Sequence, residues 1–506
     1  MNSETDKTIF GPTKYWQITI LVVILVCGFG TRLFDLTDPP LDYASTRQLR
    51  SAIISRGIYY ALADNVSELN REISLKQMGS QEMLEPQILE NLVAFTYIIV
   101  GGEHVWIARI YSSLFWTLGG LALYTLTREI VSDDGAVIAL IYYLFVPFGL
   151  LASRTFQPDP LMTASILFAW LSFFRWGKTR SWKWAWITGL TAGGAILIKS
   201  TAVFFLFFGM AVFVLLVYKL RDMIKDLQVW LIVGLSAIPA IAYHLYGYFI
   251  SGDLQGQLQG RLFNPKLWSD PRFYALWINT TSRVLGHLLI LVIALVGLFL
   301  IKKGISRWFL LGTWLGFVVY GFAVSYYVTT HSYYLLPLIP LAAISISATV
   351  DWIFKWLIKN KLRGIVWAGT ISVVILGVSL GYYLYQIEDF RHEPDYYYKV
   401  ASYVSPDKSI IALSQDYGFR LSYYGWINVQ PWSQLENLLP PGEKITEEDS
   451  YSMRFSDAMD DFDYFIITRM KDFRQQSDLR KELVDHYPVL TEGGGYLIYD
   501  LRERLD

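Results

Sequence analysis

The sequence predicts a polytopic α-helical membrane protein that carries a soluble α/β domain at its C-terminal end. Of its 506 residues, 53% are hydrophobic and only 17% are charged, and the mean hydropathy is +0.34, values that are unusual for a soluble chain. Apolar stretches close to the roughly 20 residues that span a bilayer recur along the chain. After residue 387 the composition changes, which predicts a separate domain.

The apolar stretches predict about eleven membrane crossings. The count depends on the fifth and sixth stretches, which nearly touch. The stretches are 16–33, 104–127, 134–152, 159–176, 184–199, 201–219, 228–248, 284–301, 306–328, 333–356 and 363–387.

Basic residues gather in alternate connections between these stretches. If the N-terminus is cytoplasmic, nearly all the Lys and Arg of the short connections lie inside, and the short outside turns hold only Arg154 and Lys199. Because cytoplasmic loops carry an excess of Lys and Arg, this pattern predicts a cytoplasmic N-terminus. An odd number of crossings then places the C-terminus outside, and we expect an integral protein of a prokaryotic cell membrane.

Residues 388–506 form the predicted soluble domain, and 1–387 form the membrane domain. The tail has few long apolar runs and holds 23 acidic and 13 basic residues. Short apolar runs and helical periodicity predict a small α/β domain on the outer face. The predicted strands are Ser409–Leu413, Tyr464–Thr468 and Tyr496–Leu501, and the predicted helices are Tyr396–Val404 and Lys471–Tyr487.

Several classes of function lack sequence support. The single cysteine, Cys27, lies in the first apolar stretch, so no intramolecular disulfide is possible. The chain has no Gly-rich phosphate loop, which argues against nucleotide use and nucleotide-driven transport. Its histidines lack metal-ligand spacing, no serine elbow motif is present, and nothing points to nucleic acid.

Two outside loops, at about 34–103 and 249–283, are longer than connectors need to be. The first contains Pro39-Pro40-Leu41-Asp42-Tyr43 and then a predicted interfacial helix, Tyr43–Leu62, in which Arg47 and Arg50 share a face. A carboxylate beside a basic face suits a lipid-phosphate substrate. Alternatively, Asp42 caps this helix and the arginines contact lipid headgroups.

A second acidic motif, Gln157-Pro158-Asp159-Pro160, falls on the same predicted side of the membrane. An ionisable residue at this depth is a candidate for function. Alternatively, Asp159 and Pro160 form the N-cap and first residue of a helix. Arg154 lies five residues earlier and is able to pair with Asp159 or with a substrate phosphate.

Three further polar residues lie near the predicted outer face. Lys199 ends the fifth stretch and either snorkels to the interface or neutralises a bound anion. Arg109 either pairs with an outer-face acid or snorkels. His331 opens the segment that contains Tyr334, and a lone histidine there is more often structural. A divalent metal ion held by Asp42, Asp159 and either Glu103 or His104 is a further hypothesis.

Taken in order, these motifs resemble those of the GT-C glycosyltransferases, and within them the protein O-mannosyltransferase and aminoarabinose transferase-like branch. The resemblance covers about residues 16–387, and such enzymes often carry an outside C-terminal domain. The motifs are Pro-Pro-x-Asp ending at Asp42, Ile107-Ala108-Arg109, Gln157-Pro158-Asp159, Ile198-Lys199 and His331-Ser332-Tyr333-Tyr334-Leu335-Leu336-Pro337.

The resemblance implies transfer of a sugar from a polyprenyl-phosphate donor to an acceptor on the outer face, usually with inversion. It assigns the general base, or its neighbour, to Asp42, the second acid to Asp159, and cationic positions to Arg109 and Lys199. Many relatives have Asp-Glu in the first loop, whereas this chain has Asp42-Tyr43, so the role of that glutamate is in doubt.

The function predicted is therefore that of a membrane glycosyltransferase. Its partners are a polyprenyl-phosphate sugar donor, membrane lipids and a lipid, glycan or protein acceptor. Asp42 takes the acceptor's proton, and the donor phosphate is bound by cations from the set Arg47, Arg50, Arg109, Arg154 and Lys199, with His331 and Tyr334 beside them. The alternative is a transporter or flippase of a lipid-linked or anionic substrate, which would place its ionisable residues near the bilayer midplane.

Overall fold

The computed structural model forms two compact units. The first comprises residues 1–36, 83–88 and 106–387, and the second comprises 37–82, 89–105 and 388–506. The residues that the structure describes are 9–10, 13–82, 85–217, 220–255, 262–359, 362–385, 388–432, 459 and 461–505.

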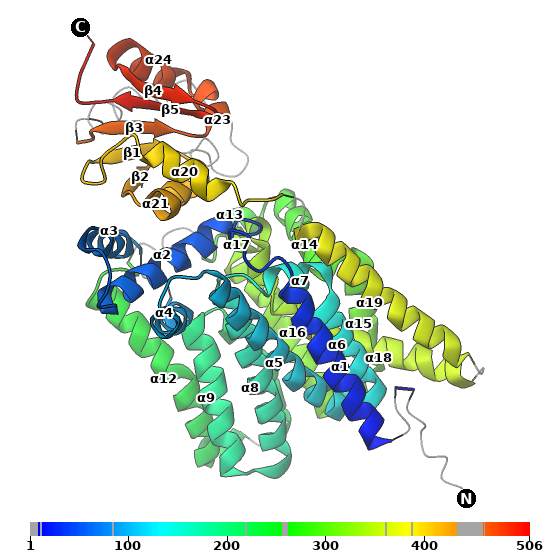
Figure 1. The fold of residues 1–506 in the computed structure, drawn as a ribbon. Helices are drawn as coiled ribbons and strands as arrows, with labels where there is room; N and C mark the ends of the chain where they lie inside the picture. Colours follow the sequence, from blue (N-terminus) through cyan, green and yellow to red (C-terminus); the bar gives the residue numbers. More distant parts are fainter. Residues whose placement is uncertain are drawn as a thin grey trace, which may run out of the picture. The chain divides into compact units, whose positions relative to one another are not determined.

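The first unit is built from helices, and most described residues of each stretch predicted to cross the membrane are helical (Figure 1). The helices are α1 (Lys14–Arg32), α5 (Trp106–Ile130), α6 (Asp133–Phe145), α7 (Pro147–Ala152), α8 (Asp159–Thr179), α9 (Trp182–Ile198), α10 (Ala202–Val217), α11 (Leu220–Lys225), α12 (Leu227–Phe249), α13 (Pro265–Trp268), α14 (Pro271–Leu285), α15 (Leu288–Leu300), α16 (Ile305–Ala323), α17 (Ser325–Thr330), η1 (Ser332–Leu335), α18 (Leu338–Lys359) and α19 (Arg363–Tyr385).

Within the described residues, five helices are long and apolar enough to span a membrane by themselves: α1, α12, α16, α18 and α19. The pair α14 and α15 makes a sixth candidate if it is one span, although it bends by 83°. The count of about eleven crossings therefore stays a prediction, because several of the remaining helices are shorter or carry charged residues.

Four of the predicted spans are interrupted, and in 333–356 the break lies at Leu336 and Pro337, between η1 and α18. Pro147 has no backbone N–H to continue the helical ladder, and it starts α7 directly after α6. Gly286, at φ 91°, separates α14 from α15, and the His287 ring then accepts a hydrogen bond from the backbone of Leu289. Val324 separates α16 from α17. Apolar composition marked these regions correctly but did not reveal the breaks.

Small residues let neighbouring helices of this unit approach closely. A Cβ atom at Gly316 of α16 would lie 2.1 Å from the carbonyl oxygen of Phe204 in α10, and one at Gly193 of α9 would lie 2.1 Å from that of Leu235 in α12. Membrane helices associate through this type of backbone contact, since lipid is as apolar as the side chains.

The second unit combines helices of the first outer loop with the C-terminal domain (Figure 1). The loop provides α2 (Ser45–Leu62), α3 (Glu68–Gly79) and most of α4 (Ile88–Val100). The C-terminal domain provides α20 (Glu393–Ala401), β1 (Ile410–Leu413), η2 (Gln415–Gly418), α21 (Phe419–Gly425), β2 (Val429–Pro431), β3 (Tyr464–Ile467), α23 (Met470–Gln475), α24 (Ser477–His486), β4 (Val489–Gly493) and β5 (Tyr496–Asp500).

The strands form one sheet in the order β2-β1-β3-β5-β4, with β1 parallel to both β2 and β3. Alternate residues of β1, β3 and β5 enter separate cores on the two faces of the sheet. Ile411 and Phe465 pack with residues of α23 and α24, whereas Ile410 and Ile466 pack with residues of α20 and α21. This alternation follows from the two-residue period of a strand.

The three predicted strands are confirmed as β1, β3 and β5. The sequence prediction did not include β2 and β4, whose residues are exposed or half-buried and so carry no apolar pattern. The predicted helix 396–404 starts earlier, at Glu393. The predicted helix 471–487 is split at Gln476 into α23 and α24.

Candidate active site

Asp159 and Lys199 form a buried ion pair in the first unit. Asp159 is the first residue of α8, and Lys199 directly follows α9. The Lys199 Nζ donates to Asp159 Oδ1 over 2.8 Å, and the two side chains are only 4% and 1% exposed. Since burial of two charges is costly unless they are well paired, each of these charges depends on the other.

The alternative interpretations of these two residues are both wrong. Pro158 occupies the N-cap of α8, and no side chain caps that helix. Lys199 does not snorkel, because its ammonium group is buried against Asp159 and lies 4.0 Å from the ring centroid of Tyr334. Arg154, considered as another partner of Asp159, donates to the backbone carbonyl oxygens of Phe34 and Asp35.

The pair leaves hydrogen-bonding capacity unused. Among the described residues, Asp159 Oδ2 is buried and has no hydrogen-bond partner. Lys199 has three N–H groups, and its one hydrogen bond to a side chain in the described part of the chain is to Asp159. The anionic oxygen of a ligand is able to accept from Lys199, and a hydroxyl group of the same ligand is able to donate to Asp159 Oδ2.

Aromatic rings cover the Lys199 ammonium. The Tyr334 ring stacks on Tyr327 with a centroid separation of 4.7 Å, and Tyr333 lies 5.1 Å from Nζ. His331 belongs to the same cluster, where its Nδ1 is 2.6 Å from the Thr330 hydroxyl. The structure thus brings Asp159, Lys199 and Tyr334 together, as well as the ring of His331 beside Tyr334.

Arg109 and Arg154 both bind the backbone where α1 leads into the first outer loop. Arg109 donates to the carbonyl oxygens of Asp35 and Leu36, each over 3.1 Å, and Arg154 donates to those of Phe34 and Asp35. Both side chains are buried. Their observed contacts fix residues 34–36, in which Asp35 has a left-handed φ of 50°.

Asp42 lies in the second unit, directly before α2. Its Oδ1 accepts hydrogen bonds from the backbone N–H of Tyr43, at 3.0 Å, and from the Gln48 amide, at 3.2 Å. The N-cap of α2 is Ala44, without a side-chain hydrogen bond. The alternative that Asp42 caps this helix is therefore wrong, and its half-buried carboxylate is held by the turn around it.

Arg47 and Arg50 lie three residues apart on α2, as predicted, and both are half-buried. Arg50 donates to the backbone carbonyl of Glu82. The helix is confirmed, whereas its place at a membrane interface stays a prediction.

The hypothesis of a divalent metal ion held by Asp42, Asp159 and either Glu103 or His104 stays a prediction. Glu103 accepts from Arg56 at 2.9 Å and from the Tyr423 hydroxyl, and His104 is exposed. Within the described ranges, no three His, Cys, Asp or Glu side chains gather as a metal ion would require. We therefore derive no step through a metal.

Arg56, Glu103 and Tyr423 form a second buried cluster, which sequence reasoning missed. The Arg56 guanidinium lies between the rings of Tyr423 and Trp426, 3.8 and 4.0 Å from their centroids. Burial, together with the Glu103 carboxylate, raises the pKa of Tyr423 well above its ordinary value, so the phenol keeps the proton that it donates. The sequence signal was an arginine inside the apolar run of α2.

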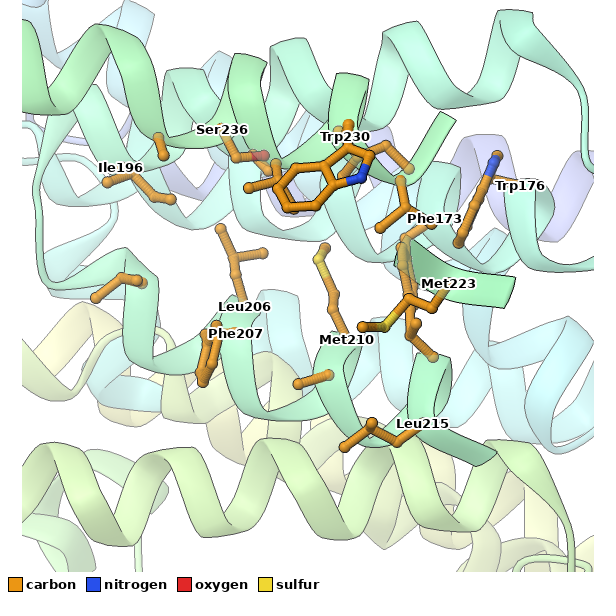
Figure 2. Close-up of a pocket in the computed structure, with 18 of the residues that line it drawn as sticks. Phe173, Trp176, Ile196, Leu206, Phe207, Met210, Leu215, Met223, Trp230 and Ser236 are labelled. Atoms are coloured by element: carbon orange, nitrogen blue, oxygen red, sulfur yellow. The ribbon is translucent and has the colours of Figure 1, made fainter. Parts of the chain in front are cut away.

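A cavity of about 530 Å³ lies among α8, α9, α10, α11 and α12 in the first unit (Figure 2). Its lining is almost entirely apolar and includes Ile196, Val203, Leu206, Met210 and Trp230. Ile196 precedes Lys199 by three residues and Val203 follows it by four. Residues on both sides of Lys199 in the sequence therefore line the cavity.

Comparison with known proteins supports the fold. A family model described as dolichyl-phosphate-mannose-protein mannosyltransferase matches residues 86–246. ArnT from Cupriavidus metallidurans, in a crystal structure with undecaprenyl phosphate bound, matches over 97% of this chain and 98% of its own, with a TM-score of 0.64 and 14% sequence identity. The predicted resemblance to the GT-C superfamily is confirmed.

A second solved structure has a similar fold. The archaeal oligosaccharyltransferase AglB from Archaeoglobus fulgidus, in complex with an inhibitory peptide and a dolichol-phosphate, has a TM-score of 0.56 and 15% identity, covering 96% of this chain and 74% of its own. No curated protein sequence matches significantly. The family match includes Asp159 and Lys199 but not Asp42 or His331. The structural matches establish the GT-C fold.

Proposed function

We propose that this protein transfers a glycosyl group from a polyprenyl-phosphate donor to an acceptor hydroxyl on the extracytoplasmic face of a prokaryotic cell membrane, with inversion. The acceptor is a lipid, a glycan or a protein. The proposal combines the GT-C fold with one observation, the incompletely bonded ion pair of Asp159 and Lys199.

This pair has the chemistry that a glycosyl phosphate needs. The two further N–H groups of Lys199 are suited to a phosphate oxygen, and the unpartnered Oδ2 of Asp159 is suited to a sugar hydroxyl. Hydrogen bonds to charged groups in a buried site are strong and need little reorganisation.

Each residue then has a role in a balanced displacement. The acceptor oxygen forms a bond to the anomeric carbon as the bond from that carbon to the phosphate oxygen breaks. The Asp42 carboxylate takes the proton of the acceptor hydroxyl. Lys199 stabilises the charge that develops on the departing polyprenyl phosphate, and Asp159 orients both Lys199 and the sugar.

Other cations act at the periphery in this proposal. Arg47 and Arg50 meet lipid phosphates at the interface, while Arg109 and Arg154 hold residues 34–36 ahead of the Asp42 loop. The apolar cavity beside α10 takes part of the prenyl chain, since such pockets bind apolar ligands largely preformed. No nucleotide is needed, because the donor phosphate supplies the leaving group.

The test is release of free polyprenyl phosphate by the purified protein in detergent, measured with a panel of polyprenyl-phosphate sugars and hydroxyl acceptors. We expect one donor to be turned over. Asp42→Asn should lower kcat about 10²- to 10⁴-fold, because it removes the general base. Asp64→Asn, which neutralises an exposed aspartate after α2, is the matched control and should be fully active.

The transporter alternative makes the opposite prediction. A flippase in proteoliposomes would move a fluorescent polyprenyl-phosphate sugar between leaflets without cleaving it, and Asp42→Asn would not abolish that movement. Translocation without any release of polyprenyl phosphate would overturn the proposed function.

A further inference from the structure

Backbone strain in the second unit is concentrated where α2 meets the C-terminal domain. Among the described residues, seven that are not glycine have a left-handed φ, and four of them are Ala44, Asp416, Tyr417 and Trp426. L-residues adopt this conformation rarely. Strained backbone persists only where surrounding contacts hold it, and it clusters at functional sites.

Asp416 and Tyr417 lie at a distinctive point of the sheet. The strand β1 has β2 on one side and β3 on the other, and both run parallel to it. In open α/β sheets, ligands bind at the carboxyl end of a strand where the order of connections reverses in this way. The strained turn, η2, follows β1 at this end.

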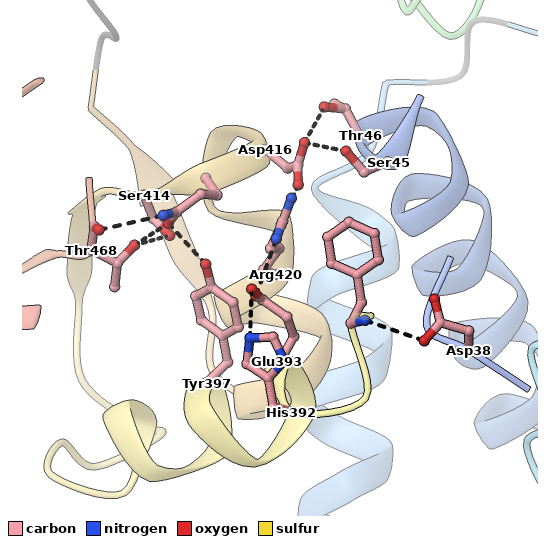
Figure 3. Close-up of polar contacts among 12 residues, drawn as sticks. Asp38, Ser45, Thr46, His392, Glu393, Tyr397, Ser414, Asp416, Arg420 and Thr468 are labelled. Atoms are coloured by element: carbon pink, nitrogen blue, oxygen red, sulfur yellow. Dashed lines mark hydrogen bonds and ion pairs between the residues drawn. The ribbon is translucent and has the colours of Figure 1, made fainter. Parts of the chain in front are cut away.

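The polar side chains at this edge largely satisfy one another (Figure 3). Tyr397 donates to Gln415 Oε1 over 2.8 Å, and Thr468 donates to Gln415 and to Ser414. Asp416, in contrast, also accepts hydrogen bonds from residues of α2, which lie outside the C-terminal domain in sequence.

The carboxylate of Asp416 binds the start of α2. Its Oδ1 accepts from the Ser45 hydroxyl at 2.6 Å and from the Thr46 hydroxyl at 3.0 Å, while its Oδ2 accepts from Arg420 at 2.5 Å (Figure 3). Arg420 in turn donates to Glu393. The partners of this carboxylate are thus divided between the outer loop and its own domain.

The start of α2 lacks the stabilising groups that helices usually carry. Its N-cap, Ala44, has a left-handed φ of 48° and provides no side-chain hydrogen bond, and its first turn has no acidic residue. Negative charge is favourable at a helix N-terminus. Asp416 supplies that charge from a position more than 370 residues away.

We propose that Asp416 is a positioning residue for Asp42. By holding Ser45 and Thr46, it maintains the left-handed turn at Ala44, and this turn fixes the backbone that presents Asp42 two residues earlier. The C-terminal domain thereby sets the position of the catalytic loop. This inference rests on the proposed function for its catalytic consequence but not for its structural one.

The test replaces Asp416 with Asn, which keeps the size and the tolerance for a left-handed backbone but removes the charge. We expect kcat to fall about tenfold with the KM for the donor unchanged, since small misplacement of a reacting group slows chemistry more than it weakens binding. Hydrogen–deuterium exchange of peptides that cover residues 38–50 should also become faster. Asp500→Asn, which removes a carboxylate paired with Arg502 in the same domain, is the matched control and should change neither readout.

A second variant tests the contact from the other side. Ser45→Ala with Thr46→Val removes both hydroxyls and should reproduce the effects of Asp416→Asn, whereas Ser45→Thr with Thr46→Ser keeps both and should resemble wild type. Combining Asp416→Asn with the first pair should add little further effect, as expected for residues that share one interaction.

Unchanged exchange at 38–50 in both sets of variants would overturn the inference, even if they fold less well. Faster exchange with unchanged kcat would also overturn it, because the contact would then be structural only. If the wild-type protein turns over no donor, the proposed function fails, and the exchange measurement still decides whether Asp416 orders the loop.

Discussion

Two buried ion pairs in the described part of this protein differ in how completely they are bonded. Arg56 and Glu103, in the second unit, are 5% and 14% exposed and lie 2.9 Å apart. Both Glu103 oxygens accept from Arg56, the Tyr423 hydroxyl donates to one of them, and Arg56 also binds the Tyr423 carbonyl at 2.6 Å. The pair of Asp159 and Lys199 leaves one carboxylate oxygen without a partner among the described residues.

This difference separates a structural pair from a candidate for function. Leaving a buried polar atom unsatisfied costs about 1 to 3 kcal/mol, so a ligand that bonds to Asp159 Oδ2 would recover part of that cost. Glu103 is bonded on every side and stabilises the contact of α2 with the C-terminal domain. In the proposed function, the second oxygen of Asp159 accepts a hydrogen bond from the substrate.

The largest effect is expected from Lys199→Ala. It should lower kcat about 10²- to 10³-fold, because the charge that stabilises the leaving phosphate is lost. It should also destabilise the protein by about 3 to 5 kcal/mol, since Asp159 is left buried without its partner. Turnover and thermal unfolding of the purified protein measure the two effects, with exposed Lys266→Ala as the control.

A variant without either charge separates these effects. Asp159→Leu combined with Lys199→Met should recover most of the stability, because buried pairs are often replaceable by apolar residues, but it should stay inactive. Activity in this double variant would show that the pair is structural and would remove the basis of the comparison.

The corresponding change in the other pair should affect stability alone. Glu103→Ala leaves the Arg56 guanidinium buried without its carboxylate and should cost about 3 to 5 kcal/mol, measured by thermal unfolding. The kcat of the folded fraction should stay within about threefold of wild type, because Asp416 still holds the start of α2 and the proposed reaction gives this cluster no role. A loss of kcat as large as that of Lys199→Ala would contradict the distinction between the pairs.

A smaller effect is expected from Arg109→Lys and Arg154→Lys. Lysine cannot reproduce the fork of hydrogen bonds to the carbonyls of residues 34–36, so each change should cost about 1 to 3 kcal/mol of stability. The KM for the donor should be unchanged. A raised KM without loss of stability would instead assign these arginines to the donor phosphate.

The smallest effect should come from filling the apolar cavity. Met210→Trp places a larger ring in the space and should raise the KM of a long-chain polyprenyl donor about tenfold, or about 1.4 kcal/mol, without affecting a short-chain analogue. Leu190→Trp, on an exposed face of α9, is the control. An equal KM for both chain lengths in Met210→Trp would show that the prenyl chain does not occupy this cavity.

The sequence by itself determined the helical class, the helical positions, three strands of the C-terminal domain and the acidic motifs. These follow from local patterns: apolar stretches of membrane length and the two-residue alternation of strands. Breaks at Pro147 and Gly286, and the exposed strands β2 and β4, were not predicted because their local patterns are weak or continuous with the neighbouring residues.

The tertiary structure alone decided which polar residues meet. Local rules gave helix caps as the alternatives for Asp159 and Asp42, yet Asp159 pairs with a lysine 40 residues away and Ala44 precedes α2. Glu103 and Tyr423 are 320 residues apart, and Asp416 and Ser45 are 371 apart. Such contacts depend on how helices and strands pack, and the free energy of that packing is shared among many side chains, so no local pattern in the sequence encodes it.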